Sequence, residues 1–285
     1  MARYQRSISN SFTVEGIGLH KGKTCQVSLH PAPVNTGIQL SFHGEERHML
    51  SPALLCHHQL CTGLRLGSKI IYTTEHLLAT LFGLHIDNVF IQVNSNEIPI
   101  LDGSALEWVK MIQPSICQQP SSIENHTVSR PVTLRNGQST LQVRPSSVLQ
   151  ISASIDFSHP LIGQQCDHYH HNQDNFLHLS QARTFGFLND HQKLLDSGYA
   201  LGASQNNCII LTSTGLLDKQ QLRFPQEMLH HKILDFLGDL AVLNLPFTGN
   251  FILHRPSHSL NQHFVKLLID DKELLTNSKN SIYYS

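Results

Sequence analysis

The stretch QEMLHHKILDFLGDLAVL, residues 226–243, predicts a long amphipathic helix. Its apolar positions recur at helical spacing and would face a core; they are Ile233, Leu234, Leu237 and Leu240. A strand over 251–255 and a helix over 259–269 are expected to follow. A helix over 74–84, a strand over 88–93 and a helix over 104–111 come in the same order earlier in the chain. This repeated order predicts an α+β fold of two similar domains from an internal duplication, each a sheet packed with helices.

The boundary between the two domains is expected in a segment rich in Pro, Ser and Gln, QPSICQQPSSIEN at 114–126. We place the first domain at 1–118, a linker at 119–126 and the second domain at 127–285. Further elements are expected as short strands within 5–50, strands over 127–134, 140–143, 149–157 and 208–211, and a helix over 189–197. Residues 158–175, which hold much of the histidine surplus, are expected to form a loop.

The composition is that of a globular protein. Of the 285 residues, 40% are hydrophobic and 14% are charged, and 20 basic residues balance 21 acidic ones to a net charge of -1. This balance gives no overall electrostatic reason to bind nucleic acid or an anionic membrane. The six cysteines form no C-x-x-C pair, and no apolar run reaches the roughly 20 residues that a transmembrane helix needs. We therefore expect a cytoplasmic protein without a transmembrane segment.

The helix at 226–243 carries a second stripe, in which His231, Asp235 and Asp239 follow one another at four-residue spacing. These side chains lie on one side of a helix, and an imidazole and a carboxylate one turn apart can bind the same metal ion. The alternative is a solvated His–Asp pair on an exposed face. Gly238 argues against a solvated pair. A glycine inside a helix costs about 1 kcal/mol, so its presence there suggests a packing or functional reason.

Glu75 and His76 open the helix expected at 74–84, with Thr74 as its N-cap and Gly83 near its end. A histidine ligand beside a glutamate suits hydrolysis, since a metal lowers the pKa of water and a carboxylate accepts the proton. The alternative role for Glu75 is a favourable charge in the first turn of a helix. Thr80, four residues after His76, rules out the H-E-x-x-H pattern, so the other ligands must come from elsewhere. Together with His231 and Asp235, His76 would leave a fourth position open, as in catalytic sites.

Several other segments are weaker candidates. His258, between a strand and a helix, could protonate a leaving amine, and Arg183–Phe187 has a hydroxyl that could polarise a carbonyl. Both could equally be ordinary surface or core residues. Two rival metal sites are a group of soft ligands at Cys56, His57, His58 and Cys61 and a histidine tract at His168, His170 and His171.

Sequence blocks along nearly the whole chain resemble one enzyme family. They are GIGLHKG at 16–22, PAPVNTG at 31–37, EHL at 75–77, DN at 87–88, EIPILDGSA at 97–105, ARTFGF at 182–187, HKILDFLGDL at 231–240 and SHSLN at 257–261. In content and order they resemble the UDP-3-O-acyl-N-acetylglucosamine deacetylases. The resemblance implies a cytoplasmic, Gram-negative enzyme that removes acetate from a UDP-linked, 3-O-acylated glucosamine in the committed step of lipid A synthesis. It also implies an active site between the two domains and, we expect, a monomer.

The resemblance also implies a role for each matching residue. His76, His231 and Asp235 would bind zinc, with ferrous iron as the alternative in the cell, and Glu75 would be the general base. His258, aided by Asp239, would stabilise the oxyanion or protonate the amine, and Thr184 would help to stabilise the tetrahedral intermediate. Substrate contacts are expected from Lys232, Phe185, Arg255, Phe187, Gly202 and Ser204. Arg255 would lie near the nucleotide, and the segment around 187–204 would line an apolar passage for the acyl chain.

Three departures from the family pattern stand out: Arg255 where a lysine is common, Ala203 in place of a glycine, and a short segment between Phe42 and Cys61. Two other functional classes remain open at this point. One is a metal-retaining relative that binds the UDP-sugar without turnover, and the other is a structural zinc protein, which would unfold when the metal is removed.

Overall fold

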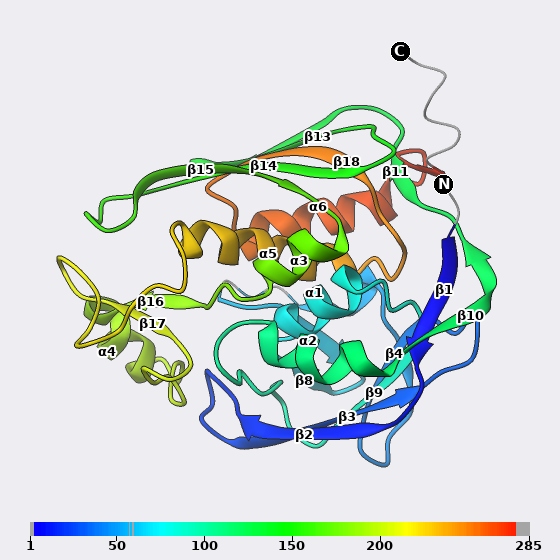
Figure 1. Cartoon of the computed structure of the whole chain (residues 1–285), viewed down its shortest axis with the longest axis horizontal. Coiled ribbons are helices and arrows are strands. Elements are labelled where there is room, and N and C mark those ends of the chain that lie inside the picture. The colour runs from blue at the N-terminus through cyan, green and yellow to red at the C-terminus, as the bar shows by residue number, and fades with distance from the viewer. Residues whose placement is uncertain (1–2, 57, 59, 278–285) are drawn as a thin grey trace.

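The computed structural model describes residues 3–56, 58 and 60–277. Two five-stranded sheets form the outer layers, and most of the helices lie between them in two layers (Figure 1). The first half of the chain supplies one sheet with its helices, and the second half supplies the other. This arrangement confirms the predicted α+β fold with two similar sheet-and-helix halves. The internal duplication stays a prediction.

The first sheet has the strand order β2-β3-β9-β4-β5. Its strands are β2 (Phe12–Ile17), β3 (Thr24–Pro31), β9 (Val89–Val93), β4 (Ile38–Phe42) and β5 (His48–Met49). Only β4 and β9 are parallel neighbours. The connection between them carries helix α1 (Glu75–Gly83), and α2 (Leu106–Ile112) follows β9. Preceding α1 are a 3-10 turn (Pro52–Leu54) and a small sheet of β6 (Leu55–Cys56), β7 (Gly63–Leu66) and β8 (Lys69–Ile71).

The second sheet repeats this plan with the order β12-β13-β18-β14-β15. Its strands are β12 (Val132–Asn136), β13 (Ser139–Arg144), β18 (Gly249–His254), β14 (Leu149–Phe157) and β15 (Gly163–His170). Again one pair, β14 and β18, is parallel, and the connection between its strands carries α5 (Glu227–Ala241). Helix α6 (His258–Asp270) follows β18, as α2 follows β9. The matching strand order and directions place α1 and α5 at equivalent positions.

Additional elements of the second half extend this frame. Helix α3 (Gln173–Leu179) precedes a parallel pair of short strands, β16 (Phe185–Phe187) and β17 (Ile209–Leu211), and α4 (Leu188–Asp196) lies in the connection between these strands. In Figure 1, α4, β16 and β17 lie at the left edge of the molecule, whereas α3 lies among the central helices. Near the chain ends, β11 (His126–Val128) pairs with β19 (Leu275–Asn277). None of the described helices has the length and apolar character needed to span a bilayer.

Helices α1 and α5 pack against each other in the centre of the molecule. Leu77, Leu81, Leu234 and Leu237 are each at most 1% exposed, and burial of one such side chain stabilises by about 1.5–3 kcal/mol. Gly238 permits the close approach, because a Cβ atom there would lie 2.2 Å from the Glu75 carbonyl oxygen. The packing reason expected for this glycine is confirmed.

Two predicted irregular segments are in fact strands. Within the predicted linker, β10 (Ile116–Ile123) pairs antiparallel with β1 (Arg3–Ile8). Pro120 is tolerated because the register shifts between Tyr4 and Arg6 opposite it, where the ladder is interrupted. The predicted loop over 158–175 contains the edge strand β15, whose outward residues are polar and therefore resemble a loop in composition. The domain boundaries themselves stay a prediction.

One predicted strand is divided. Residues 127–134 belong to two strands, β11 and β12, separated by Ser129, Arg130 and Pro131. Proline lacks the amide hydrogen that a continuous ladder needs, so the chain changes sheet there. The other predicted helices and strands occur within a few residues of their expected ends.

Candidate metal centre and active site

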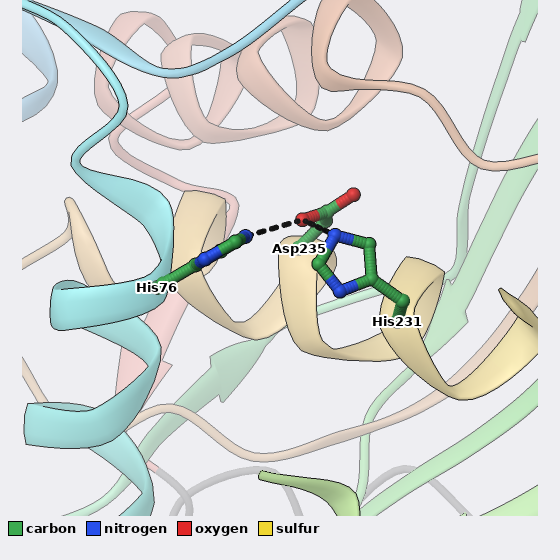
Figure 2. A group of neighbouring side chains, drawn as sticks. All are labelled: His76, His231 and Asp235. Atoms are coloured by element: carbon green, nitrogen blue, oxygen red, sulfur yellow. Dashed lines mark ion pairs between the residues drawn. The ribbon is translucent and has the colours of Figure 1, made fainter. Parts of the chain in front are cut away.

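Three predicted ligands converge where α1 meets α5 (Figure 2). His76 lies in the first turn of α1, and His231 and Asp235 lie one turn apart on α5. Nε2 of His76 is 3.7 Å and Nε2 of His231 is 3.3 Å from Oδ1 of Asp235. One ligand atom from each residue falls within 4.8 Å of the other two, and all three side chains are buried. Ligands about 2.0–2.2 Å from one ion would be spaced in this way.

The surroundings of these residues favour the protonation states that metal ligands need. Nδ1 of His231 lies 3.0 Å from the Ala182 carbonyl oxygen, an acceptor that leaves the Nε2 lone pair facing the site. Burial lowers the pKa of His231 to about 3, so this imidazole is neutral at pH 7. Burial opposes ionisation of Asp235, but His231 and Lys232 outweigh it and hold the pKa of this carboxyl well below its usual value. The set therefore offers nitrogen donors and a carboxylate, the ligands of catalytic zinc sites.

Glu75 is the first residue of α1 and lies beside the ligands. One of its carboxylate oxygens accepts a hydrogen bond from the Thr62 amide, at 2.8 Å. Burial raises the pKa of Glu75, while His258 and His76 act in the opposite direction. A carboxylate with a raised pKa is a better proton acceptor. Thr74 stands at the predicted N-cap position, but its side chain makes no capping hydrogen bond to α1. The Thr74 hydroxyl donates to the Thr62 carbonyl instead.

His258 begins α6 and reaches the same site from the second half. Its Nδ1 lies 2.8 Å from Oδ2 of Asp239, and its Nε2 lies 3.7 Å from Oδ2 of Asp235. Burial acts to lower the pKa of His258, but Asp239 and Asp235 outweigh it and raise the pKa to about 9. A protonated imidazole thus faces the ligands, placed to donate a proton or to stabilise negative charge.

A cavity of about 180 Å³ opens at these residues. Thr184, Phe185 and Lys232 line it, and the roles that the resemblance implies for them stay predictions. The Lys232 ammonium donates to Asp235 at 2.9 Å and lies 5.7 Å from the centre of the Phe185 ring. A second cavity of about 320 Å³ is lined by Phe187 together with Phe157 and Leu211. Because Phe157 contacts both Phe185 and Phe187, an aromatic wall connects the two cavities.

Other predicted substrate contacts lie outside these cavities. Gly202 belongs to a turn that docks on the first half, with its amide donating to the Leu19 carbonyl at 3.0 Å. The Ser204 amide donates to Asn207 in the same turn. Arg255 forms an ion pair with Asp156 at 2.7 Å. The roles of all three in substrate binding stay predictions.

His20 lines the cavity, although the sequence assigned it no role. It is 7% exposed, and neither ring nitrogen has a hydrogen-bond partner within the described structure. Burial lowers the pKa of His20 to about 4, so the ring is neutral. The sequence could have pointed to His20, because it lies within the GIGLHKG block that resembles the family. The Glu97 carboxylate fixes this turn by accepting from the amides of His20 and Lys21, a contact between distant segments.

The rival metal sites receive no support from the described residues. Across residues 3–56, 58 and 60–277, His76, His231 and Asp235 are the one group of three ligand side chains close enough to share an ion. In the first rival site, His57 lies outside the described residues, and burial raises the pKa of the Cys61 thiol well above its usual value. In the second, His168 contacts Ser152 and His171 contacts the Tyr169 hydroxyl.

Comparisons with known proteins agree with this site. Residues 5–270 match the family model described as UDP-3-O-acyl N-acetylglycosamine deacetylase. A UDP-3-O-acyl-N-acetylglucosamine deacetylase of Nitratidesulfovibrio vulgaris is 36% identical over 274 residues, which cover 95% of this chain and 89% of that protein. The proteins of the same name from Oleidesulfovibrio alaskensis and Lawsonia intracellularis are 37% and 38% identical, each over 95% of this chain and 90% of the relative.

Proposed function

We propose that this chain converts UDP-3-O-acyl-N-acetylglucosamine to the free amine and acetate. This is the committed step of lipid A synthesis. The chain belongs to the UDP-3-O-acyl N-acetylglycosamine deacetylase family and is thus a hydrolytic deacetylase. The observation that carries the proposal is the convergence of His76, His231, Asp235 and Glu75 with the His258–Asp239 pair. These groups supply a metal site, a base and an acid within one buried centre.

His76, His231 and Asp235 would hold the metal, which we propose is zinc, with ferrous iron as the alternative in the cell. The metal would supply a Lewis acid that makes water more acidic and polarises a carbonyl. Glu75 takes the proton from the attacking water, since its raised pKa favours proton uptake. The acetamide carbon becomes tetrahedral, and the Thr184 hydroxyl donates to the developing oxyanion.

His258 completes the reaction. Its imidazolium, held by Asp239, stabilises the oxyanion or gives a proton to the nitrogen as the C–N bond breaks. The products are acetate and the free amine. The sum of these steps is addition of one water across the amide bond, with no other reactant.

Substrate contacts follow from the lining of the cavities. Lys232 and Phe185 would hold the substrate at the metal, and the aromatic wall toward Phe187 would accommodate the acyl chain. Gly202, Ser204 and Arg255 are proposed as further contacts, Arg255 near the nucleotide. A monomer in the cytoplasm is the proposed form of the enzyme.

Acetate release from UDP-3-O-acyl-N-acetylglucosamine tests the proposal. The purified protein, its chelator-treated form and the form reloaded with zinc or ferrous iron are compared, with circular dichroism recorded on each. We expect activity to be lost with the metal and restored by reloading, with the fold retained throughout. Tight substrate binding without acetate would instead show a binding protein, and unfolding on chelation would show a structural metal.

A further inference from the structure

Thr62 lies between the two groups to which the proposed function assigns proton transfer. It precedes β7 in the first half of the chain and is 0% exposed. Its backbone contacts Glu75, and its side chain contacts Asp239, the partner of His258. None of the sequence blocks or spacings pointed to this residue.

The backbone of Thr62 is fixed against the start of α1. Its amide donates to Oε2 of Glu75 at 2.8 Å. Its carbonyl accepts from the Thr74 amide at 3.2 Å and from the Thr74 hydroxyl at 3.1 Å. One hydrogen bond therefore holds the Glu75 carboxylate on the Thr62 amide, and two more hold Thr74, the residue before Glu75, on the Thr62 carbonyl.

The side chain of Thr62 completes the surroundings of Asp239. The hydroxyl donates to Oδ1 of this carboxylate. The other oxygen, Oδ2, accepts from Nδ1 of His258 at 2.8 Å and from the side-chain Nδ2 of Asn261 at 2.9 Å. Since Asp239 is 0% exposed, water cannot replace a lost donor. An oxygen left without its donor is costly, so the carboxylate would turn away from its present position.

We propose that Thr62 is a positioning residue that holds the base Glu75 and the acid His258 in register across the boundary between the two halves of the molecule. Glu75 belongs to α1 of the first half, and Asp239 and His258 belong to α5 and α6 of the second half. Thr62 contacts Glu75 in the first half through its backbone amide and Asp239 in the second half through its hydroxyl. This inference rests on the proposed function for the roles of Glu75 and His258, but not for the contacts.

Three variants of the metal-loaded enzyme test the inference. Thr62→Val keeps the shape and the amide but removes the hydroxyl, Thr62→Ser keeps the hydroxyl, and Thr127→Val removes an equally buried hydroxyl in β11. We expect Thr62→Val to lower kcat about 10- to 100-fold, the range for loss of alignment in an active site. KM should change less than about threefold, and metal content should stay at the parent level. Thr62→Ser should recover kcat to within about threefold, and Thr127→Val should match the parent.

A second readout does not depend on turnover. The Nδ1 proton of His258 should give a downfield proton resonance, identified by its absence in His258→Gln. We expect this resonance to be kept in Thr62→Ser and Thr127→Val but broadened or moved in Thr62→Val. If Thr62→Val does not fold, Thr62→Ala takes its place in both measurements.

The outcomes separate this inference from the proposed function. A parent enzyme that releases no acetate would refute the proposed function, and the resonance would still test Thr62. A Thr62→Val enzyme with parental kcat and an unchanged resonance would overturn the positioning role. So would a Thr62→Ser enzyme as slow as Thr62→Val, or a loss of kcat that follows a loss of metal.

Discussion

Replacement of Gly238 by alanine tests the close approach of α1 and α5 on which the metal centre depends. A Cβ atom at this position would lie 2.2 Å from the carbonyl oxygen of Glu75, 2.7 Å from its carbonyl carbon and 2.8 Å from its Cα. All three atoms belong to the backbone, so no change of rotamer relieves the overlap. Contact distances near 3.5 Å require the helices to separate by about 1 Å.

Two effects of the Gly238→Ala change oppose each other. Alanine is a better helix former than glycine and by itself would stabilise α5 by about 1 kcal/mol. Overpacking usually costs about 1–3 kcal/mol, and a clash with backbone belongs at the upper end of that range. We therefore expect a net loss of about 1–2 kcal/mol in the free energy of unfolding. A separation of about 1 Å also exceeds the roughly 0.2 Å tolerance of metal–ligand distances, so metal affinity should fall at least about tenfold and kcat about 100-fold.

Urea unfolding of the metal-free protein and competition with a coloured chelator measure the two quantities separately. Gly215→Ala is the control, because a Cβ atom there meets no other atom within 4 Å. It should leave both quantities near the parent values. A Gly238→Ala protein that is more stable than the parent by about 1 kcal/mol, with unchanged metal affinity, would show that helix propensity decides and that the contact is not tight.

Three further changes have expected outcomes. Glu75→Ala should keep the metal but lose most turnover, measured by metal analysis beside acetate release; if metal content falls with activity, Glu75 is needed to assemble the site. Glu227→Gln should cost about 3 kcal/mol in urea unfolding, because it breaks a buried ion pair with Arg183 (2.8 Å), and a loss below about 1 kcal/mol would contradict this. Burial opposes ionisation of Asp102, but Arg223 and Ser104 lower its pKa below the usual 3.8, so its contribution to stability is present above that pH and is lost as the pH falls. Asp102→Asn should flatten this acid-side loss in unfolding measured between about pH 6 and pH 3, and an unchanged pH dependence would exclude the pair as its source.

Local periodicity predicted the elements that bury one face. In α5 the apolar stripe recurs at helical spacing, and in β14 buried Leu149, Ile151, Ala153 and Ile155 alternate with less buried neighbours. Strands β10 and β15 were not predicted, because neither has an apolar pattern that marks one buried face. Their side chains are largely polar, and each strand owes its conformation to hydrogen bonds with a partner far away in the sequence or around a turn. The composition of a segment does not show whether such a partner strand exists.

The candidate site also has a part that local sequence predicted and a part that it did not. His231 and Asp235 share one helix, so their four-residue spacing predicted that they face the same ion. The contact of Asp239 with His258 was expected only from the family resemblance, and the structure places these groups 2.8 Å apart. Thr62 and His20 depend on loops whose positions are set by packing. The catalytic roles of all these residues stay predictions until activity is measured.

The position of the centre follows from the repeated topology. In each half, a parallel pair of strands needs a crossover, and the crossover helix, α1 or α5, covers one face of its sheet. When the two helix-covered faces pack together, α1 and α5 become neighbours at the middle of the molecule (Figure 1). Gly238 then sets how closely they approach, because the start of α1 at Glu75 meets α5 at Gly238, in the turn that follows Asp235. Ligands from helices some 150 residues apart therefore converge because both halves use the same crossover, and any change that separates the two helices should act on metal affinity before it acts on either sheet.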